Sequence, residues 1–214
     1  MADCCDPSGL QAFFGEARAR SDARKYRRKG LDGEGRRIVE FLVERGIAGG
    51  TLLEVGGGIG ALQIELLRAG AARARSVEIS SAYEAVAREL ASEAGIVERI
   101  DRRVGDFAVE HAGMDSADAV VLHRVVCCYP DMPGLVQPAA ERARRWLVLT
   151  FPGDRWWIRL GLRSVSAAQS LFRRRFRVFF HEPSEIVAIA RAARLEPALA
   201  RRGFFWQLLA LERS

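Results

Sequence analysis

The stretch that decides the fold is residues 51–60, which read Thr-Leu-Leu-Glu-Val-Gly-Gly-Gly-Ile-Gly. Its first five residues form a short, largely apolar run that is typical of a strand buried on both faces. The glycines that follow carry no Cβ, so the backbone turns sharply there and can approach a ligand closely. Apolar residues at positions 64, 66 and 67 then predict a helix. This order of strand, glycine-rich turn and helix indicates the ligand-binding edge of an open α/β sheet.

The same alternation of strands and helices continues to the end of the chain. Four further strands are predicted over residues 74–79, 100–104, 117–126 and 146–151, with helices over 82–94, 135–144 and 185–194, the last capped by Ser184. Two β-prone runs, residues 197–200 and 204–211, predict an antiparallel hairpin at the sheet edge. The predicted fold class is therefore α/β, a doubly wound, mostly parallel seven-stranded sheet with an antiparallel C-terminal hairpin.

Two segments lie outside this alternation. Residues 1–35 are polar and basic and predict an N-terminal helical lid segment, so that the main domain spans residues 36–214. Residues 154–177 contain two tryptophans, with six arginines between Arg155 and Arg175, and predict a helical insert after the fifth strand. Three interpretations of the insert remain open: a lid over a bound molecule, a peripheral contact with a membrane surface, or a helix packed on the sheet.

Composition narrows the class of protein. The chain has 214 residues, of which 49% are hydrophobic, enough for the core of one α/β domain. No apolar run approaches the roughly 20 residues of a membrane-spanning helix, and residues 1–7 do not resemble a secretory signal. We therefore expect a cytoplasmic protein. The net charge of +6 would attract nucleic acid or an acidic partner, but opposite charges are interspersed, which favours a solvated arginine-rich surface.

The four cysteines form two adjacent pairs, Cys4-Cys5 and Cys127-Cys128. Neighbouring cysteines do not bridge each other easily, and a reducing cytoplasm disfavours disulfides. No Cys/His spacing of a structural zinc site occurs. Free thiols and no metal are therefore predicted, while the alternative that the two pairs converge on a soft metal ion stays open.

Three acidic residues follow three successive predicted strands. Glu54 ends the first strand, Glu78 ends the second strand 24 residues later, and Asp106 follows the third. Because parallel strands end at one edge of a sheet, one acid can accept from ribose hydroxyls and another from an adenine amino group, with Phe107 covering the ring. The acids together predict an adenosine-binding site. The glycine spacing differs from the G-x-G-x-x-G of dehydrogenases, which leaves a dehydrogenase as a weak alternative.

Residues 51–107 resemble the cofactor-binding half of the class I S-adenosylmethionine-dependent methyltransferases, and the layout extends this resemblance over residues 36–213. The E-x-G-x-G-x-G loop of that family is matched by Glu54, Gly56, Gly58 and Gly60. The resemblance implies S-adenosylmethionine as the cofactor, with Glu78 and Ile79 at its ribose and Asp106 at its adenine. The N-terminal helices and the stretch after the fifth strand are loosely similar to small-molecule methyltransferases of the ubiquinone and magnesium-protoporphyrin type.

The end of the fourth predicted strand supplies candidates for the acceptor side. In the family that this chain resembles, this strip contributes to the cofactor site and the acceptor site, which implies cofactor contacts for His123 and substrate contacts for Arg124 and Tyr129. His123 is also a candidate general base, because the pKa of free histidine is near neutrality. Arg124 either binds an acidic group of the substrate or pairs with a nearby acid. His181 is a second candidate catalytic residue.

The resemblance thus implies a methyltransferase that acts on a small molecule, with oxygen as the first expectation for the methylated atom. Two alternatives stay open: a cofactor-binding scaffold or enzyme that does not transfer methyl groups, and a basic nucleic-acid-binding protein. Nucleic acid is disfavoured, because residues 123–126 replace the Asn/Asp-Pro-Pro-aromatic motif of amino methyltransferases.

Overall fold

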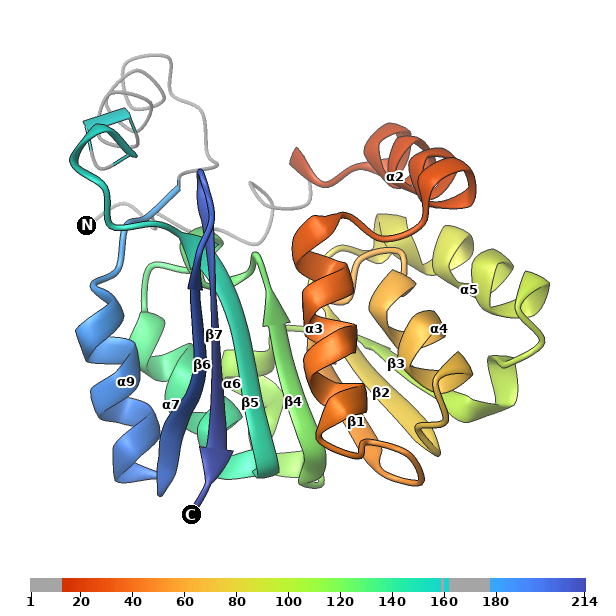
Figure 1. The fold of residues 1–214 in the computed structure, drawn as a ribbon. Helices are drawn as coiled ribbons and strands as arrows, with labels where there is room; N and C mark the ends of the chain where they lie inside the picture. Colours follow the sequence, from red (N-terminus) through yellow and green to blue (C-terminus); the bar gives the residue numbers. More distant parts are fainter. Residues whose placement is uncertain (1–12, 159, 162–177) are drawn as a thin grey trace.

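The structure is a computed structural model that describes residues 13–158, 160–161 and 178–214. A single sheet runs through the described chain in the order β3-β2-β1-β4-β5-β7-β6 (Figure 1). Its strands are β1 (Thr51–Val55), β2 (Arg73–Glu78), β3 (Ile100–Val104), β4 (Ala117–His123), β5 (Ala143–Pro152), β6 (Leu195–Arg202) and β7 (Trp206–Arg213). The first five strands pair in parallel and β7 pairs antiparallel to both β5 and β6. The predicted fold class is confirmed.

Helices cover both faces of this sheet (Figure 1). The described helices are α2 (Glu16–Lys29), α3 (Gly33–Glu44), α4 (Ala61–Arg68), α5 (Glu84–Glu93), α6 (Phe107–Glu110), α7 (Met132–Arg142) and α9 (Pro183–Ala192), of which α2 packs on α5 beyond the ends of the strands (Figure 1). Side chains alternate along β4, so that Ala119 and Val121 pack with α3 and α4, whereas Val120 and Leu122 pack with α7 and α9. All four are fully buried. This two-sided burial explains why the strand reads as a continuous apolar run.

The fourth strand is shorter than predicted. It ends at His123 because Arg124 adopts the left-handed conformation, with φ of 62°, and a 3-10 turn follows over Val126–Cys128. Left-handed backbone is costly for a residue with a Cβ and does not continue a strand. The apolar pattern of residues 125–126 therefore reflects a buried turn rather than strand.

The predicted cap of the last helix is wrong. The N-cap of α9 is Glu182, without a side-chain hydrogen bond, and the helix already begins at Pro183. Proline fits the first position of a helix because its fixed φ is helical and its missing N–H has no partner there. Ser184 lies inside the first turn of the helix.

The predicted insert over 154–177 is described only in part. Residues 156–158 and 160–161 are helical, and residues 159 and 162–177 lie outside the described residues. The ring of Trp157 packs against Phe204, with 4.9 Å between ring centroids, and Ile158 is buried. No helix within the described ranges is long and apolar enough to cross a membrane.

Candidate functional site

A cavity of about 550 Å³ lies where β1, β2 and β4 end, beneath the N-terminal segment that leads into α2. We divide its lining into two sides. The glycine-loop side consists of residues 54–58, 78–79 and 105–107, and the β4 side consists of Asp32, residues 123–125 and 127–129, and Trp206. Most of the predicted site residues line it: Glu54, Gly56, Gly58, Glu78, Ile79, Asp106, Phe107, His123, Arg124 and Tyr129. Gly60 and His181 are absent from its described lining.

The glycine loop requires glycine for two different reasons. Gly56, Gly58 and Gly60 have φ of 69°, 49° and 77°, a region that side chains disfavour. Gly57 has no such φ, but a Cβ there would lie 2.3 Å from Ser76 Oγ and 2.5 Å from Gln63 Nε2. The position that sequence analysis treated as variable is therefore the most tightly enclosed of the loop.

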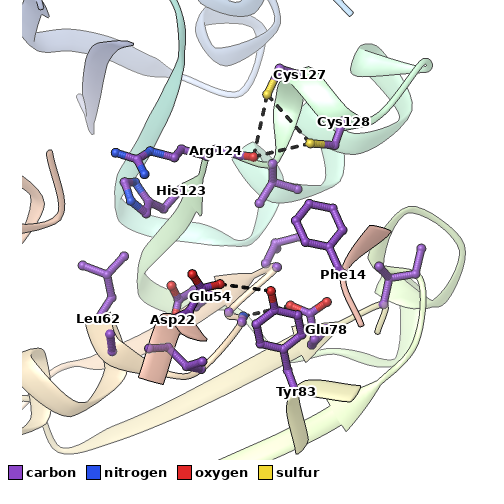
Figure 2. Close-up of a pocket in the computed structure, with 18 of the residues that line it drawn as sticks. Phe14, Asp22, Glu54, Leu62, Glu78, Tyr83, His123, Arg124, Cys127 and Cys128 are labelled. Carbon is purple, nitrogen blue, oxygen red and sulfur yellow. Dashed lines mark hydrogen bonds between the residues drawn. The ribbon is translucent and has the colours of Figure 1, made fainter. Parts of the chain in front are cut away.

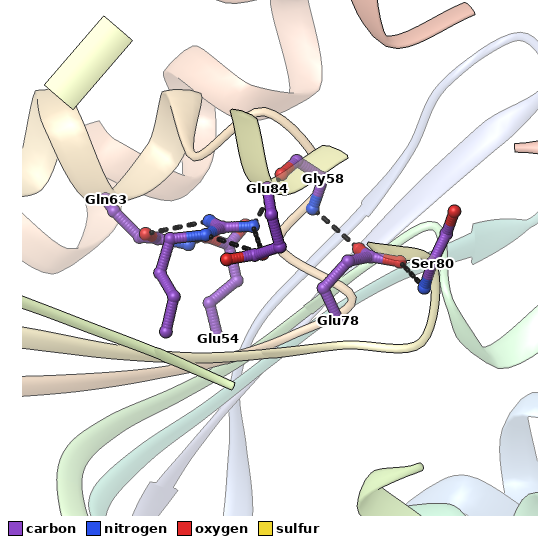
Figure 3. Close-up of polar contacts among 7 residues, drawn as sticks. Glu54, Gly58, Gln63, Glu78, Ser80 and Glu84 are labelled. Atoms are coloured by element: carbon purple, nitrogen blue, oxygen red, sulfur yellow. Dashed lines mark hydrogen bonds and ion pairs between the residues drawn. The ribbon is translucent and has the colours of Figure 1, made fainter. Parts of the chain in front are cut away.

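Glu78 is held rigidly at the end of β2. Its carboxylate accepts hydrogen bonds from the backbone N–H of Gly58, at 2.8 Å, and of Ser80, at 2.9 Å (Figure 3). The side chain lines the cavity, and the residue is only 6% exposed. Burial raises the pKa of Glu78, while the two amide hydrogen bonds act in the opposite direction. The amides fix the carboxylate in place, and its remaining lone pairs are free to accept from hydroxyl groups.

Glu54 is buried behind the loop. Gln63 Nε2 donates to its carboxylate at 2.8 Å, and burial raises the pKa of Glu54 to about 7. Arg102 on β3 joins the same network, because its guanidinium donates to Gln63 Oε1 at 3.4 Å. It also donates to the carbonyl of Gly58 and to Glu84, both at 2.9 Å. Arg102 was not predicted from the sequence, because it lies among charged residues on an edge strand and belongs to no motif.

Asp106 and Tyr129 connect the two sides of the cavity. The carboxylate of Asp106 accepts from the backbone N–H of Ala108, at 3.0 Å, which caps α6. Its other oxygen accepts from the hydroxyl of Tyr129, also at 3.0 Å. Phe107 is buried in the core beneath α7 and lines the cavity. Tyr129, predicted to contact the substrate, thus lies against the residue predicted to bind adenine.

His123 and Arg124 meet an acid that sequence analysis did not identify. Asp32, the N-cap of α3, forms an ion pair with Arg124, and one of its oxygens lies 3.8 Å from His123 Nε2. The other ring nitrogen of His123, Nδ1, lies 2.8 Å from Thr150 Oγ1. The guanidinium of Arg124 stacks 4.8 Å from the ring centre of Trp206. Arg124 therefore pairs with a nearby acid, which is one of the two roles predicted for it.

The electrostatics of this corner disfavour proton uptake. Burial, together with the positive charge of Arg124, lowers the pKa of His123 to about 4, although Asp32 acts in the opposite direction. The imidazole is consequently neutral at neutral pH and a weak base. His181 places Nε2 2.9 Å from the backbone carbonyl of Tyr129, so it supports the turn beneath the cavity.

The residues present suit an adenosyl ligand. The backbone of the glycine loop is open to close approach, Glu78 offers a fixed carboxylate, and Asp106 offers a second acceptor at the end of the next strand. The cavity lining between them is mainly apolar, which suits a base and a thioether chain.

Comparison with known proteins agrees with this geometry. Residues 53–146 match a family model described as a methyltransferase domain. No curated protein matches the sequence.

Three solved structures are similar over most of the chain. Magnesium protoporphyrin IX methyltransferase from Synechocystis PCC 6803, with bound S-adenosylhomocysteine, is 21% identical with a TM-score of 0.76, covering 97% of this chain and 99% of that one. An O-methyltransferase family protein from Burkholderia thailandensis is 18% identical, with a TM-score of 0.67 and coverage of 92% and 60%. Geranyl diphosphate C-methyltransferase from Streptomyces coelicolor A3(2) is 18% identical, with a TM-score of 0.62 and coverage of 83% and 78%.

These identities are low, so the structures show a shared fold, whereas the family model identifies the domain. Residues 53–146 match a methyltransferase domain, which indicates an enzyme, and the described chain has the fold of the class I S-adenosylmethionine-dependent methyltransferases.

Proposed function

We propose that the cavity binds S-adenosylmethionine and that the enzyme transfers the methyl group to an oxygen atom of a small molecule. The observation that carries this proposal is the carboxylate of Glu78, which two backbone amides fix inside the cavity beside the glycine loop. A fixed acid at the end of the second strand is suited to accept from both hydroxyls of a ribose.

The roles of the glycine-loop side follow from its groups. Glu78 accepts from the ribose, with Ile79 packing beside it, and Asp106 accepts from the adenine amino group. Gly56 and Gly58 let the backbone lie against the ligand, and the apolar lining excludes water. When bound, S-adenosylmethionine supplies a methyl group that its sulfonium charge already activates. The residues of the chain then only need to hold the donor and acceptor in line.

On the β4 side, we assign His123 to positioning rather than to proton removal. Its pKa of about 4 makes it a poor base at neutral pH, and Nδ1 is already engaged with Thr150. Arg124 is held by Asp32 and Trp206, so its charge orients the acceptor without being mobile. The proton of a hydroxyl acceptor then leaves to water. An acidic acceptor that is already ionised has no proton to lose.

An acceptor of small size is supported by the cavity itself. About 550 Å³ lies within the range of small-molecule sites and is shared between donor and acceptor. The names of the similar structures, a porphyrin methyltransferase and a geranyl diphosphate methyltransferase, are consistent with such an acceptor. Oxygen is the preferred atom because one similar structure is an O-methyltransferase family protein.

The test is turnover. Purified enzyme is incubated with S-adenosylmethionine and a panel of small molecules that bear a hydroxyl, a carboxylate, an amine or a nucleophilic carbon, and S-adenosylhomocysteine is measured. We expect release with at least one oxygen acceptor, with a product heavier by one methylene unit. At subsaturating donor, release with Glu78→Ala should be about 10- to 100-fold slower. Release with nitrogen or carbon acceptors alone would overturn the choice of oxygen. Donor binding without release for any acceptor would favour a cofactor-binding protein that does not transfer methyl groups.

A further inference from the structure

Two thiols lie in the cavity on the side away from the fixed carboxylate. Sγ of Cys127 and Sγ of Cys128 are 3.9 Å apart, and both residues line the cavity. Figure 2 shows the two sulfur atoms on one side of the cavity and Glu78 on the other. Both cysteines are free thiols. Adjacent residues in extended chain point apart, so two converging sulfurs require a specific backbone conformation.

That conformation is supplied by Arg124 and the 3-10 turn. Arg124 and Arg194 are the two residues other than glycine with positive φ in the described chain. The left-handed backbone of Arg124 turns its carbonyl toward the thiols, so that the oxygen lies 3.8 Å from Sγ of Cys127 and 3.7 Å from Sγ of Cys128. Backbone strain of this kind persists only where the surrounding structure holds it, and it concentrates at functional sites.

The turn is held from both sides. The N–H of Cys128 donates to the carbonyl of Val125, at 2.8 Å, and the N–H of Phe179 donates to the carbonyl of Cys127, at 2.7 Å. His181 secures the next residue through the carbonyl of Tyr129. The hydrogen bond between the thiols lowers the pKa of Cys127, which favours a thiolate at one of the two sulfurs. The pair is therefore preorganised rather than accidental.

The set of available ligands decides what such a pair binds. Two thiolates on one tetrahedral zinc ion lie roughly 3.8 Å apart, since Zn–S bonds are about 2.3 Å long. However, no cluster of three or more His, Cys, Asp or Glu able to hold a metal occurs within the ranges that the structure describes. A structural metal would lack its remaining protein ligands. A soft, three-coordinate centre that brings its own third substituent needs only two protein sulfurs, and this pair supplies both.

We propose that Cys127 and Cys128 form a dithiol site for a thiophilic trivalent centre, a class represented by monosubstituted trivalent arsenicals. Each of the two sulfur atoms forms one bond to arsenic. The arsenic loses its two oxygen bonds, the two thiol protons leave with that oxygen as water, and no oxidant or reductant is needed. The ligand would lie on the β4 side of the cavity, where the acceptor is proposed to bind. The site does not depend on methyl transfer.

The probe is phenylarsine oxide, added in one equivalent to folded Cys4→Ser/Cys5→Ser protein and followed by intact mass. We expect one adduct per chain. Its mass should correspond to loss of one water, neither remaining thiol should be free afterwards, and excess monothiol should not remove it. When Cys127→Ser or Cys128→Ser is added to the same background, only one sulfur–arsenic bond can form. The monothiol concentration that removes the adduct should then be about 100-fold lower than for the protein with both thiols.

The matched control is Cys127→Ser/Cys128→Ser protein, which keeps the adjacent pair Cys4-Cys5 and measures what adjacency alone provides. We expect this control to release the adduct at a monothiol concentration at least about 10-fold lower than the Cys4→Ser/Cys5→Ser protein does. Absence of an adduct at Cys127 and Cys128, or equal retention by the two proteins, would overturn the site. Calorimetric binding of S-adenosylmethionine, measured on the same samples, separates this failure from a failure of the proposed donor site.

Discussion

The two sides of the cavity are built in different ways. On the glycine-loop side, the groups proposed to contact the donor lie within residues 54–107. Glu78 is held there by the backbone amides of Ser80, two residues away, and of Gly58, 20 residues away. On the β4 side, Asp32, His123 and Trp206 come from three distant segments, and Thr150, which holds His123, comes from a fourth. One side is therefore a local structure that sequence can encode as a motif, and the other exists only after folding.

The largest effect is expected for Glu78→Ala on the glycine-loop side. Loss of a charged acceptor for ribose hydroxyls should weaken binding of S-adenosylmethionine about 10- to 100-fold, since hydrogen bonds to charged groups contribute about 1.5–3 kcal/mol. Isothermal titration calorimetry measures this, with surface Glu89→Ala as the control. Unchanged affinity in Glu78→Ala would show that the second strand does not hold the donor.

Enclosure of the glycine loop is tested next by Gly57→Ala. The new Cβ would meet Ser76 and Gln63, and overpacking of this kind costs about 1–3 kcal/mol of folding free energy. Denaturant unfolding measures the loss. Gly113→Ala is the matched control, because a Cβ there meets nothing within 4 Å. A loss in Gly57→Ala no greater than in the control would mean that the loop is loosely packed.

A smaller, pH-dependent effect is expected at Glu54. Its folded pKa of about 7 lies above the ordinary value of 4.5, so between these values the folded chain keeps a proton that the unfolded chain has released. This group therefore lowers stability as pH rises from 4.5 to 7. In Glu54→Gln, the fall in melting temperature between about pH 5 and about pH 8 should be smaller than in wild type. Exposed Glu98→Gln should behave like wild type, and identical pH profiles for all three proteins would contradict the buried charge.

The smallest effect on the donor is expected from the β4 side. Asp32→Asn removes the ion pair with Arg124 and the charge beside His123, but these contacts lie on the β4 side and not among the donor groups of the glycine-loop side. Donor affinity should stay within about 2-fold of wild type, while the melting temperature falls modestly because Arg124 loses its partner. A donor affinity lowered as strongly as in Glu78→Ala would mean that the two sides form one binding unit.

The features that could be predicted from the sequence differ between the two sides in the same way. The strands over 51–55 and 100–104 were predicted with the observed bounds, because apolar runs and glycine turns are local signals. Asp32 was not predicted as a site residue, because an acid directly before a helix is typical of an N-cap. Asp32 is indeed the N-cap of α3. Arg102 and Gly57 were missed because their roles depend on Glu84 and Ser76, neighbours that only the folded sheet provides.

The central claim is that the glycine-loop side binds S-adenosylmethionine, and calorimetric titration of the wild-type protein tests it most directly. S-adenosylmethionine and S-adenosylhomocysteine are predicted to bind in the micromolar range with one site per chain, and NADH is predicted not to bind. Binding of NADH, or binding of neither adenosyl ligand by folded protein, would contradict the account.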